Sequence, residues 1–194
     1  MQTKCATITL LIAFLLFVSV QCENKNSRVD LEITDNEGKT AIFHAAQGGN
    51  VEITTLLINH GARVDRTDKK GNSVLHDSVL YGNFGVTELF LKSGAKANLR
   101  RFTDGHTALH IACQLGRLDI VKLLVEKGGA DIEIAANDGS TPLAVALRNE
   151  HIEIADYLQT KQNHTRHMGK TNQKKIEQTV KRDESRRMKD REEL

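Results

Sequence analysis

Three side chains with reactive groups follow one another at three-residue steps in the middle of the sequence: Thr107, His110 and Cys113. A hydroxyl or a thiol beside an imidazole is the combination from which enzymes build an activated nucleophile. Such a site also requires a third group that orients the imidazole. The rest of the chain shows whether these residues form one site or belong to a repeated unit.

The segment around these residues recurs along the chain. A glycine followed two residues later by Thr or Ser and then by apolar residues occurs four times, at steps of 33, 34 and 34 residues, as GKTAI from Gly38, GNSVL from Gly71, GHTAL from Gly105 and GSTPL from Gly139. Two further glycines keep the same register, at Gly49, Gly82 and Gly116 and at Gly61, Gly94 and Gly128. Repetition at this period indicates stacked units of a few short elements each.

The residue pattern of each unit predicts a turn, a short helix, a tight connection, a longer helix and an extended segment that leads to the next unit. In the third unit we expect the short helix from about Ala108 to Leu115 and the longer one from about Leu118. The longer helix presents a broad apolar face at helical spacing, formed by Ile120, Val121, Leu123 and Leu124. Gly128 is expected to end it as a C-cap glycine.

The segment GHTALHIACQLGRLDIVKLLVEKGGADI resembles the ankyrin repeat, whose TPLHxA motif corresponds to TALHIA, SVLHDS, TAIFHA and TPLAVA in this sequence. The resemblance covers about residues 35–160, as units of about 35–67, 68–101, 102–135 and 136–160. It implies an all-α solenoid of helix-turn-helix units with β-hairpin-like connecting loops. Residues 23–34 are expected to form an N-terminal edge segment, since residues 28–34 are similar to the end of an upstream unit.

The resemblance implies structural roles for the polar motif residues. In ankyrin repeats the Thr caps the first helix and shares hydrogen bonds with the His, which ties the turn to the neighbouring unit. The positions concerned are Thr40, Ser73, His76, Thr107, His110 and Thr141. Phe43 and Ala144 replace the His in the terminal units, where one face has no neighbour. Cys113 occupies a place that small or apolar residues hold in the other units, so we expect a buried side chain and not a nucleophile.

We expect no catalytic residue, no cofactor and no metal site. The histidines of the array that lie outside the motif fall at different repeat positions, so they do not converge as ligands must. The spacing of His164 and His167 favours adventitious affinity for nickel or zinc over a native site. The sequence contains no GxSxG motif and no phosphate-binding glycine loop. These observations predict a protein that is not an enzyme.

Both ends of the sequence resemble targeting signals. Lys4 precedes the apolar run CATITLLIAFLLFVSV, which predicts a signal peptide over residues 1–22 that is cleaved after Cys22. The run is shorter than the roughly 20 residues that a spanning helix needs. We therefore expect no stable membrane insertion after cleavage, and an uncleaved signal-anchor is the alternative. The final REEL resembles the KDEL class of retention signals and consists of Arg191, Glu192, Glu193 and Leu194.

The two signals together favour the lumen of the endoplasmic reticulum, with a KDEL-type retrieval receptor as a partner of the C-terminus. Secretion is the alternative. Asn163, in the sequon NHT, is the expected glycosylation site. Removal of residues 1–22 would leave Cys113 as the only cysteine and permit no intramolecular disulfide. Residues 161–194 contain eleven Lys or Arg, six acids and few apolar residues, which predicts a disordered charged tail.

The partner is expected to be a protein bound in the concave groove that the turn tips and first helices form. An apolar group in the middle of the array, flanked by cations, predicts a hot spot. The predicted contact residues are Lys69, Lys70, Leu80, Tyr81, Arg100, Arg101, Phe102, Gln114 and Leu115. In the alternative interpretation, Leu80 and Leu115 pack between first helices and Phe102 folds under its loop.

Charge is distributed unevenly along the array. Residues 63–101 carry eight cations and four acids, a net charge of +4, whereas residues 104–156 carry four cations and nine acids, a net charge of −5. Such polarity would orient a partner. Nucleic acid is not expected, because no series of stacking aromatic residues accompanies the cations. Three functions remain: an interaction module of the secretory pathway, a secreted effector or toxin-like protein that acts outside the cell, and a signal-anchored membrane adaptor.

Overall fold

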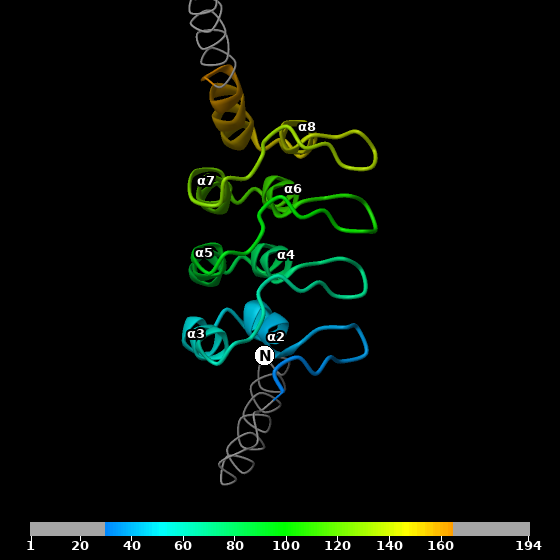
Figure 1. Cartoon of the computed structure of the whole chain (residues 1–194). Helices are drawn as coiled ribbons and strands as arrows, with labels where there is room; N and C mark the ends of the chain where they lie inside the picture. The colour runs from blue at the N-terminus through cyan, green and yellow to red at the C-terminus, as the bar shows by residue number, and fades with distance from the viewer. Residues whose placement is uncertain (1–29, 165–194) are drawn as a thin grey trace, which may run out of the picture.

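Paired short helices, joined by tight turns, make up most of the part of this chain that the structure describes. The computed structural model describes residues 30–164, so the predicted signal peptide, residues 23–29 of the edge segment and the terminal REEL lie outside the described residues. The helix pairs are α2 (Ala41–Gly48) with α3 (Val51–Asn59), α4 (Val74–Leu80) with α5 (Phe84–Lys92), α6 (Ala108–Gln114) with α7 (Leu118–Glu126), and α8 (Pro142–Arg148) with a helix over residues 152–164. Figure 1 shows the four pairs stacked in a column with a loop projecting from each.

The repeated residues explain where the helices begin and turn. An extended Thr or Ser precedes every first helix as its N-cap residue, and in α8 a proline takes the first helical position. The turn inside each pair requires a left-handed residue, which is Gly49, Gly82 or Gly116 in the first three units. In the fourth unit Glu150 takes that conformation, at a φ of 60°.

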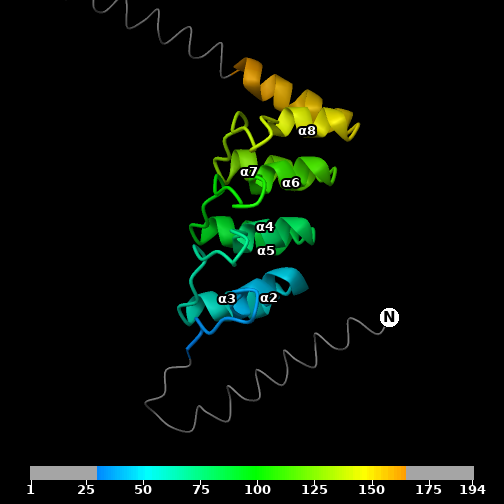
Figure 2. The same cartoon turned by 90° about the vertical axis from the view of Figure 1, so that its right-hand side faces the viewer.

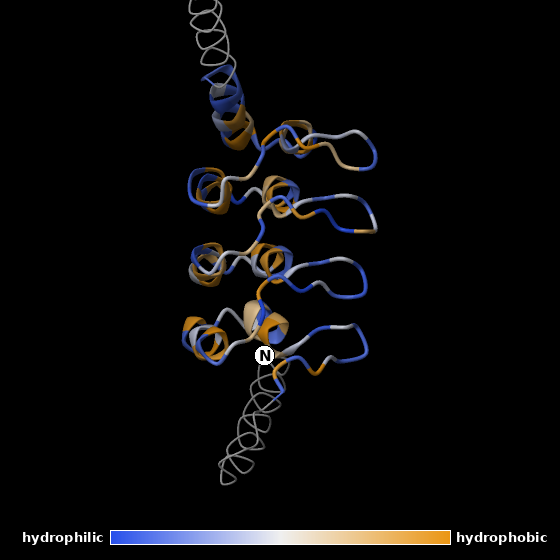
Figure 3. Cartoon of the chain, viewed as in Figure 1, coloured by the Kyte–Doolittle hydropathy of each residue, from blue (hydrophilic) through white to orange (hydrophobic). Residues whose placement is uncertain are grey.

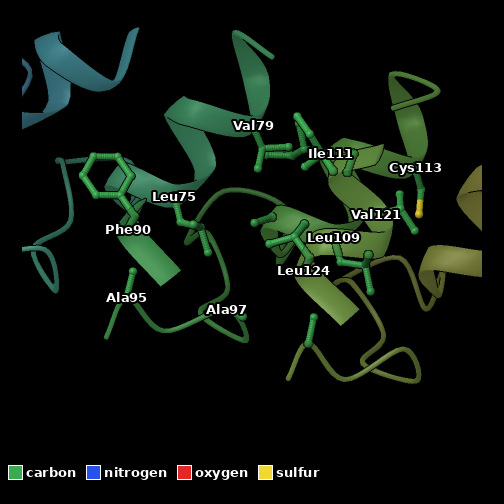
Figure 4. Packing of buried hydrophobic residues seen from close by; sticks show 14 of the residues in the cluster. Leu75, Val79, Phe90, Ala95, Ala97, Leu109, Ile111, Cys113, Val121 and Leu124 are labelled. Atoms are coloured by element: carbon green, nitrogen blue, oxygen red, sulfur yellow. The ribbon is translucent and has the colours of Figure 1, made fainter. Parts of the chain in front are cut away.

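The hydrophobic core lies mainly between units. First helices pack on first helices, α2 on α4, α4 on α6 and α6 on α8, and α3, α5 and α7 form a parallel second column. Figure 2 shows the turns within the pairs along one edge of the stack and the connections between units along the other. Figure 4 shows Val79 of α4 beside Ile111 of α6, with Cys113 among the buried side chains. Hydrophobic residues gather in the helices and hydrophilic residues in the loops (Figure 3).

The helix α7 ends at Glu126, close to the predicted Gly128, but the predicted cap conformation of Gly128 is wrong. The left-handed residue after α7 is Gly129, and not Gly128 as the repeat register predicted. A side chain at Gly128 would overlap the carbonyl oxygen of Leu124, so this position requires glycine for space. Gly61 and Gly94 each take the left-handed conformation directly after the helix cap, whereas here Gly128 allows the close packing and Gly129 takes the left-handed conformation. The N–H of Ala130 donates to the carbonyl oxygen of Leu124 across a loop that is one residue longer.

The loops between units are hairpin-like turns closed by backbone hydrogen bonds, and the described residues contain an isolated β-bridge between Thr67 and Ser73 but no strand. The last helix runs through residue 164, beyond the domain boundary predicted at residue 160. It is held there by Lys161, whose Nζ donates to Glu126 at 3.2 Å. Asn163 lies exposed in that helix. Within residues 30–164, no helix is long and apolar enough to cross a bilayer.

Candidate protein-binding surface

The motif hydroxyl and histidine form a closed hydrogen-bond set in each of the two middle units. The Ser73 hydroxyl lies 2.8 Å from His76 Nδ1, which also accepts the Ser73 backbone N–H. His76 Nε2 then donates to the carbonyl oxygen of His106 in the next unit, at 3.2 Å. Thr107 and His110 repeat the arrangement, with Nε2 donating to Ser140 at 3.1 Å. Each histidine therefore connects its own helix start to the following unit.

These pairs have the spacing of a nucleophile and its base but lack access to a substrate. Ser73, His76, Thr107 and His110 are all buried. Burial lowers the pKa of His76 to about 4 and lowers the pKa of His110 as well, so both rings are neutral at physiological pH. Burial also raises the pKa of the Cys113 thiol to about 12. A neutral thiol and enclosed hydroxyls stabilise the stack and offer no nucleophile at the surface.

The terminal units use the motif differently. Thr141 accepts the backbone N–H of Ala144 at 3.3 Å, whereas the side chain of Thr40 makes no such bond although its backbone caps α2.

His106 stacks on His110 with ring centroids 5.1 Å apart. Its Nδ1 lies 3.7 Å from Asp104 and makes no hydrogen bond. In the part of the chain that the structure describes, no three His, Cys, Asp or Glu side chains are placed to hold a metal ion.

A second set of contacts between units was missed by the sequence analysis. In the second, third and fourth units the residue after the mid-unit turn reaches back to the preceding unit: Asn83 Nδ2 donates to the carbonyl oxygens of Ala46 at 2.6 Å and Gln47 at 3.2 Å. His151 Nε2 donates to Gln114 at 3.2 Å, and the Arg117 guanidinium lies against Gly82. The signal was available, because a polar residue stands at this position in all four units.

A buried ion pair fixes the first unit on the second. Lys39 Nζ lies 3.3 Å from Asp77, a nearly inaccessible residue of α4. Gln47 of α2 donates to the same carboxylate at 2.8 Å. The Gln47 amide therefore helps to satisfy this buried charge, which leaves fewer polar groups free for a partner.

The tips of the inter-unit loops contain Phe102 as their most exposed large hydrophobic residue, at 70%. The third loop closes between Arg101 and His106, one residue longer than the loop between Asp68 and Asn72. The N–H of Phe102 donates to the carbonyl oxygen of Lys70, and the Phe102 side chain lies against Gly71. A side chain at Gly71 would overlap Phe102, so this close approach depends on glycine.

The predicted cationic side chains at the loop tips differ in how free they are to contact a partner. Arg100 donates to Asn137 at 2.8 Å and to the carbonyl oxygen of Gly105, while Arg101 forms a two-pronged pair with Asp104. Both guanidinium groups therefore hold the third loop. Lys69 Nζ donates to the carbonyl oxygen of Asn36 at 2.9 Å, and Lys70 is exposed beside Phe102.

Most of the exposed hydrophobic surface lies elsewhere, at the turns within the helix pairs. Seven of the ten large hydrophobic residues that are exposed in the described part of the chain lie within three residues of such a turn, and each is 41% to 59% exposed. We call these residues the turn-edge row: Val51, Leu80, Tyr81, Phe84, Leu115, Leu147 and Ile152. The exposed Gln114 lies beside Leu115. The row follows the edge of the stack on which Figure 2 shows the intra-pair turns.

The structure does not gather the four apolar residues of the predicted hot spot. Leu80 and Tyr81 lie at the carboxyl end of α4, whereas Phe102 contacts Gly71, which precedes the amino end of that helix. The seven residues of α4 separate the two places by about 10 Å. Leu80, Tyr81 and Leu115 belong to the turn-edge row, and Phe102 stands apart at the loop tips. Leu80 and Leu115 do not pack between the first helices but are exposed.

Comparison with known proteins gives one match of high coverage. The family model described as "Ankyrin repeats (3 copies)" matches residues 8–101 and residues 96–168, which together exceed half of the chain. A search among curated proteins finds no match. The four stacked pairs, the hydroxyl–histidine bonds between units and the hairpin-like loops agree with the family model, and the chain belongs to the ankyrin-repeat family.

Proposed function

We propose that this protein is a non-enzymatic protein-interaction module of the secretory pathway. Ankyrin repeats serve as protein-interaction modules, and this supports the general part of the proposal. The observation that carries it is the turn-edge row, because contiguous exposed apolar side chains mark interaction sites on soluble domains. The motif residues that resemble catalytic groups are buried in bonds between units.

The proposed contact residues fall in two regions. Leu80, Tyr81, Gln114 and Leu115 lie at the turn edge, and Phe102 with Lys69 and Lys70 lies at the loop tips. Arg100 and Arg101 contribute indirectly, because they hold the third loop in place. Tyr and Phe are enriched among residues that dominate binding energy, so Tyr81 and Phe102 are the best single probes of the two regions.

A capture experiment tests the interaction function. The full-length protein is immobilised and exposed to an extract of secretory compartments, beside a Tyr81→Ala/Phe102→Ala variant with an unchanged melting temperature. We expect the wild type to retain proteins that the variant does not. Retention of the same proteins by both would overturn the proposed surface. The variant Leu56→Ala, which removes an exposed apolar side chain outside both regions, is the matched control.

The proposed compartment is the lumen of the endoplasmic reticulum, with cleavage after Cys22 and retrieval through Arg191–Leu194 by a KDEL-type receptor. The apolar run after Lys4 and the final REEL support it. Mass spectrometry of the protein from secretory cells should find Glu23 as the first residue and a glycan on Asn163. An intact N-terminus would favour the membrane adaptor.

Deletion of the last four residues tests retention separately. We expect the shortened protein to appear in the medium while the full chain stays in the cell. Equal secretion of both would exclude retrieval and favour an effector that acts outside the cell.

A further inference from the structure

The turn-edge row crosses the whole stack. Val51 comes from the first unit, Phe84 from the second, Leu115 from the third and Ile152 from the fourth. Packed helices lie about 8 to 10 Å apart, which sets the spacing of the units. Residues seven apart on an α-helix lie about 10.5 Å apart along its axis and on nearly the same face. A helix laid along the stack therefore presents one apolar side chain to each unit.

The charges beside the row are mainly acidic. Four exposed carboxylates lie within three residues of Gly49, Gly116 or Glu150, the left-handed residues of the turns within the pairs: Glu52, Asp119, Glu150 and Glu153. None of these four forms an ion pair within residues 30–164. Two guanidinium groups lie at the same edge: Arg117 is partly buried against Gly82, and Arg148 lies 3.7 Å from Asp138. The edge therefore offers carboxylates to a cationic partner.

We infer that the turn edge is the main binding surface and that its occupant is a cationic amphipathic helix of a partner protein. This inference rests on the proposed interaction function and specifies its partner. Apolar residues at every seventh position of that helix would contact the row, and flanking Lys or Arg would face Glu52, Asp119, Glu150 and Glu153. This is recognition of a helix by its apolar face, with charge that sets specificity and orientation.

Charge also separates this occupant from two others. A second copy of the chain would bring the four carboxylates of one edge against those of another, and like charges across an interface disfavour association. An anionic membrane surface would repel the same carboxylates. The cationic C-terminal part of the chain fits the charge, but its apolar residues Met168, Ile176, Val180 and Met188 follow at intervals of 8, 4 and 8 and not at intervals of seven.

A synthetic peptide tests the inference directly. The probe has about 22 residues, with leucine at positions a and d of each heptad and lysine at the neighbouring positions. Its binding to the full-length protein is followed by fluorescence anisotropy. We expect saturable binding that weakens with salt. A peptide with glutamate in place of lysine should bind at least about 10-fold more weakly.

Two matched variants of the full chain locate the contact. Tyr81→Ser/Phe84→Ser removes apolar side chains from the row, whereas Ile33→Ser/Leu56→Ser removes exposed apolar side chains outside it. We expect the first to weaken binding at least about 10-fold and the second to change it less than about 2-fold. Melting curves establish that both are folded. Equal effects of the two variants, or no effect of the first, would overturn the inference.

A third variant tests the chain's own cationic segment. If Lys174→Glu/Lys175→Glu in the full chain tightens peptide binding about 10-fold or more, that segment occupies the row and the inferred partner is wrong. An unchanged affinity supports the inference. Failure of the peptide to bind while the capture experiment still depends on Tyr81 or Phe102 would overturn the inference alone. Failure of both experiments would overturn the proposed function as well.

Discussion

Both ring nitrogens of His76 are engaged in the native state, one by Ser73 and the other by the carbonyl oxygen of His106. A proton on Nδ1 would break the bond from the Ser73 N–H and place a charge in the interior. Desolvation is the main reason why the pKa of His76 lies at about 4 and not at its usual 6.5. The cost of protonating this buried ring makes the stability of the stack sensitive to pH.

The sign of that dependence follows from linkage. The unfolded chain takes up a proton on His76 near pH 6.5, and the native state does so only near pH 4, so acidification through this interval favours unfolding. We expect the contribution of His76 to the free energy of unfolding to be complete above about pH 7 and to fall by about 2 kcal/mol by pH 5. His110 acts in the same direction.

Urea titrations at pH 7 and pH 5 measure this loss. His76→Gln should remove a large part of the difference between the two pH values, whereas His44→Gln, at an exposed histidine, is the matched control. A pH slope that His76→Gln leaves unchanged would contradict the structural role of His76.

Glu150 occupies the turn position that glycine holds in the other three units. Its φ of 60° lies in the left-handed region, which costs a residue with a side chain about 1 to 2 kcal/mol. We expect Glu150→Gly to stabilise the protein by up to about 1 kcal/mol, since the greater freedom of glycine in the unfolded chain offsets part of the gain. Thermal melts measure the change. Glu153→Gly, inside the following helix, should destabilise instead and serves as the control.

At the scale of the elements, the contact of Asn83 with α2 should govern how firmly the first unit is held. Asn83→Ala removes two partly buried hydrogen bonds to carbonyl oxygens and should cost about 1 to 3 kcal/mol. We expect amide exchange to accelerate in α2 and α3 more than in α6 and α7. Asn50→Ala removes only a cap within the first unit and should cost about 1 kcal/mol without that bias. Uniform acceleration in the Asn83 variant would contradict the proposed coupling.

The packing of the third unit offers a further test. Leu123 lies on the inner face of α7 and is buried. Leu123→Ala should cost about 2 to 5 kcal/mol, because neighbouring units cannot collapse fully into the space. Lys122→Ala, at an exposed position of the same helix, should change the stability little. Chemical denaturation of both variants measures the difference, and equal values would mean that this face is not a core.

The sequence predicted the elements well because each unit repeats the same start and turn residues. Thr or Ser before the first helix and glycine at the turn mark places where backbone geometry restricts the residue type. Prediction was wrong at Gly128 and Gly129, because adjacent glycines can each take the left-handed conformation and only packing against Leu124 distinguishes them. The extension of the last helix to residue 164 depends on contacts such as Lys161 with Glu126, which a residue pattern does not contain.

The binding surface was less predictable. Exposed Leu80, Tyr81 and Leu115 were found from their repeat positions, but they were grouped with Phe102, which lies at the other end of α4. A correct grouping of these residues requires the three-dimensional arrangement of the chain. The apolar residue two positions after each mid-unit turn, such as Val51 or Phe84, was a usable signal in the sequence. These residues form one surface because the turns within the helix pairs lie along one edge of the stack, which the sequence does not show.

For the whole molecule, the central claim is that this ankyrin stack binds a partner along its turn edge. Phe84 and Leu56 provide a pair for testing it, because both are exposed large hydrophobic residues and only Phe84 belongs to the turn-edge row. A photoreactive phenylalanine analogue replaces either residue in the full-length protein, which is then irradiated in an extract of secretory compartments. The account predicts a protein adduct of defined mass from position 84 and little or none from position 56. Adducts from position 56 alone, or from neither position, would contradict it.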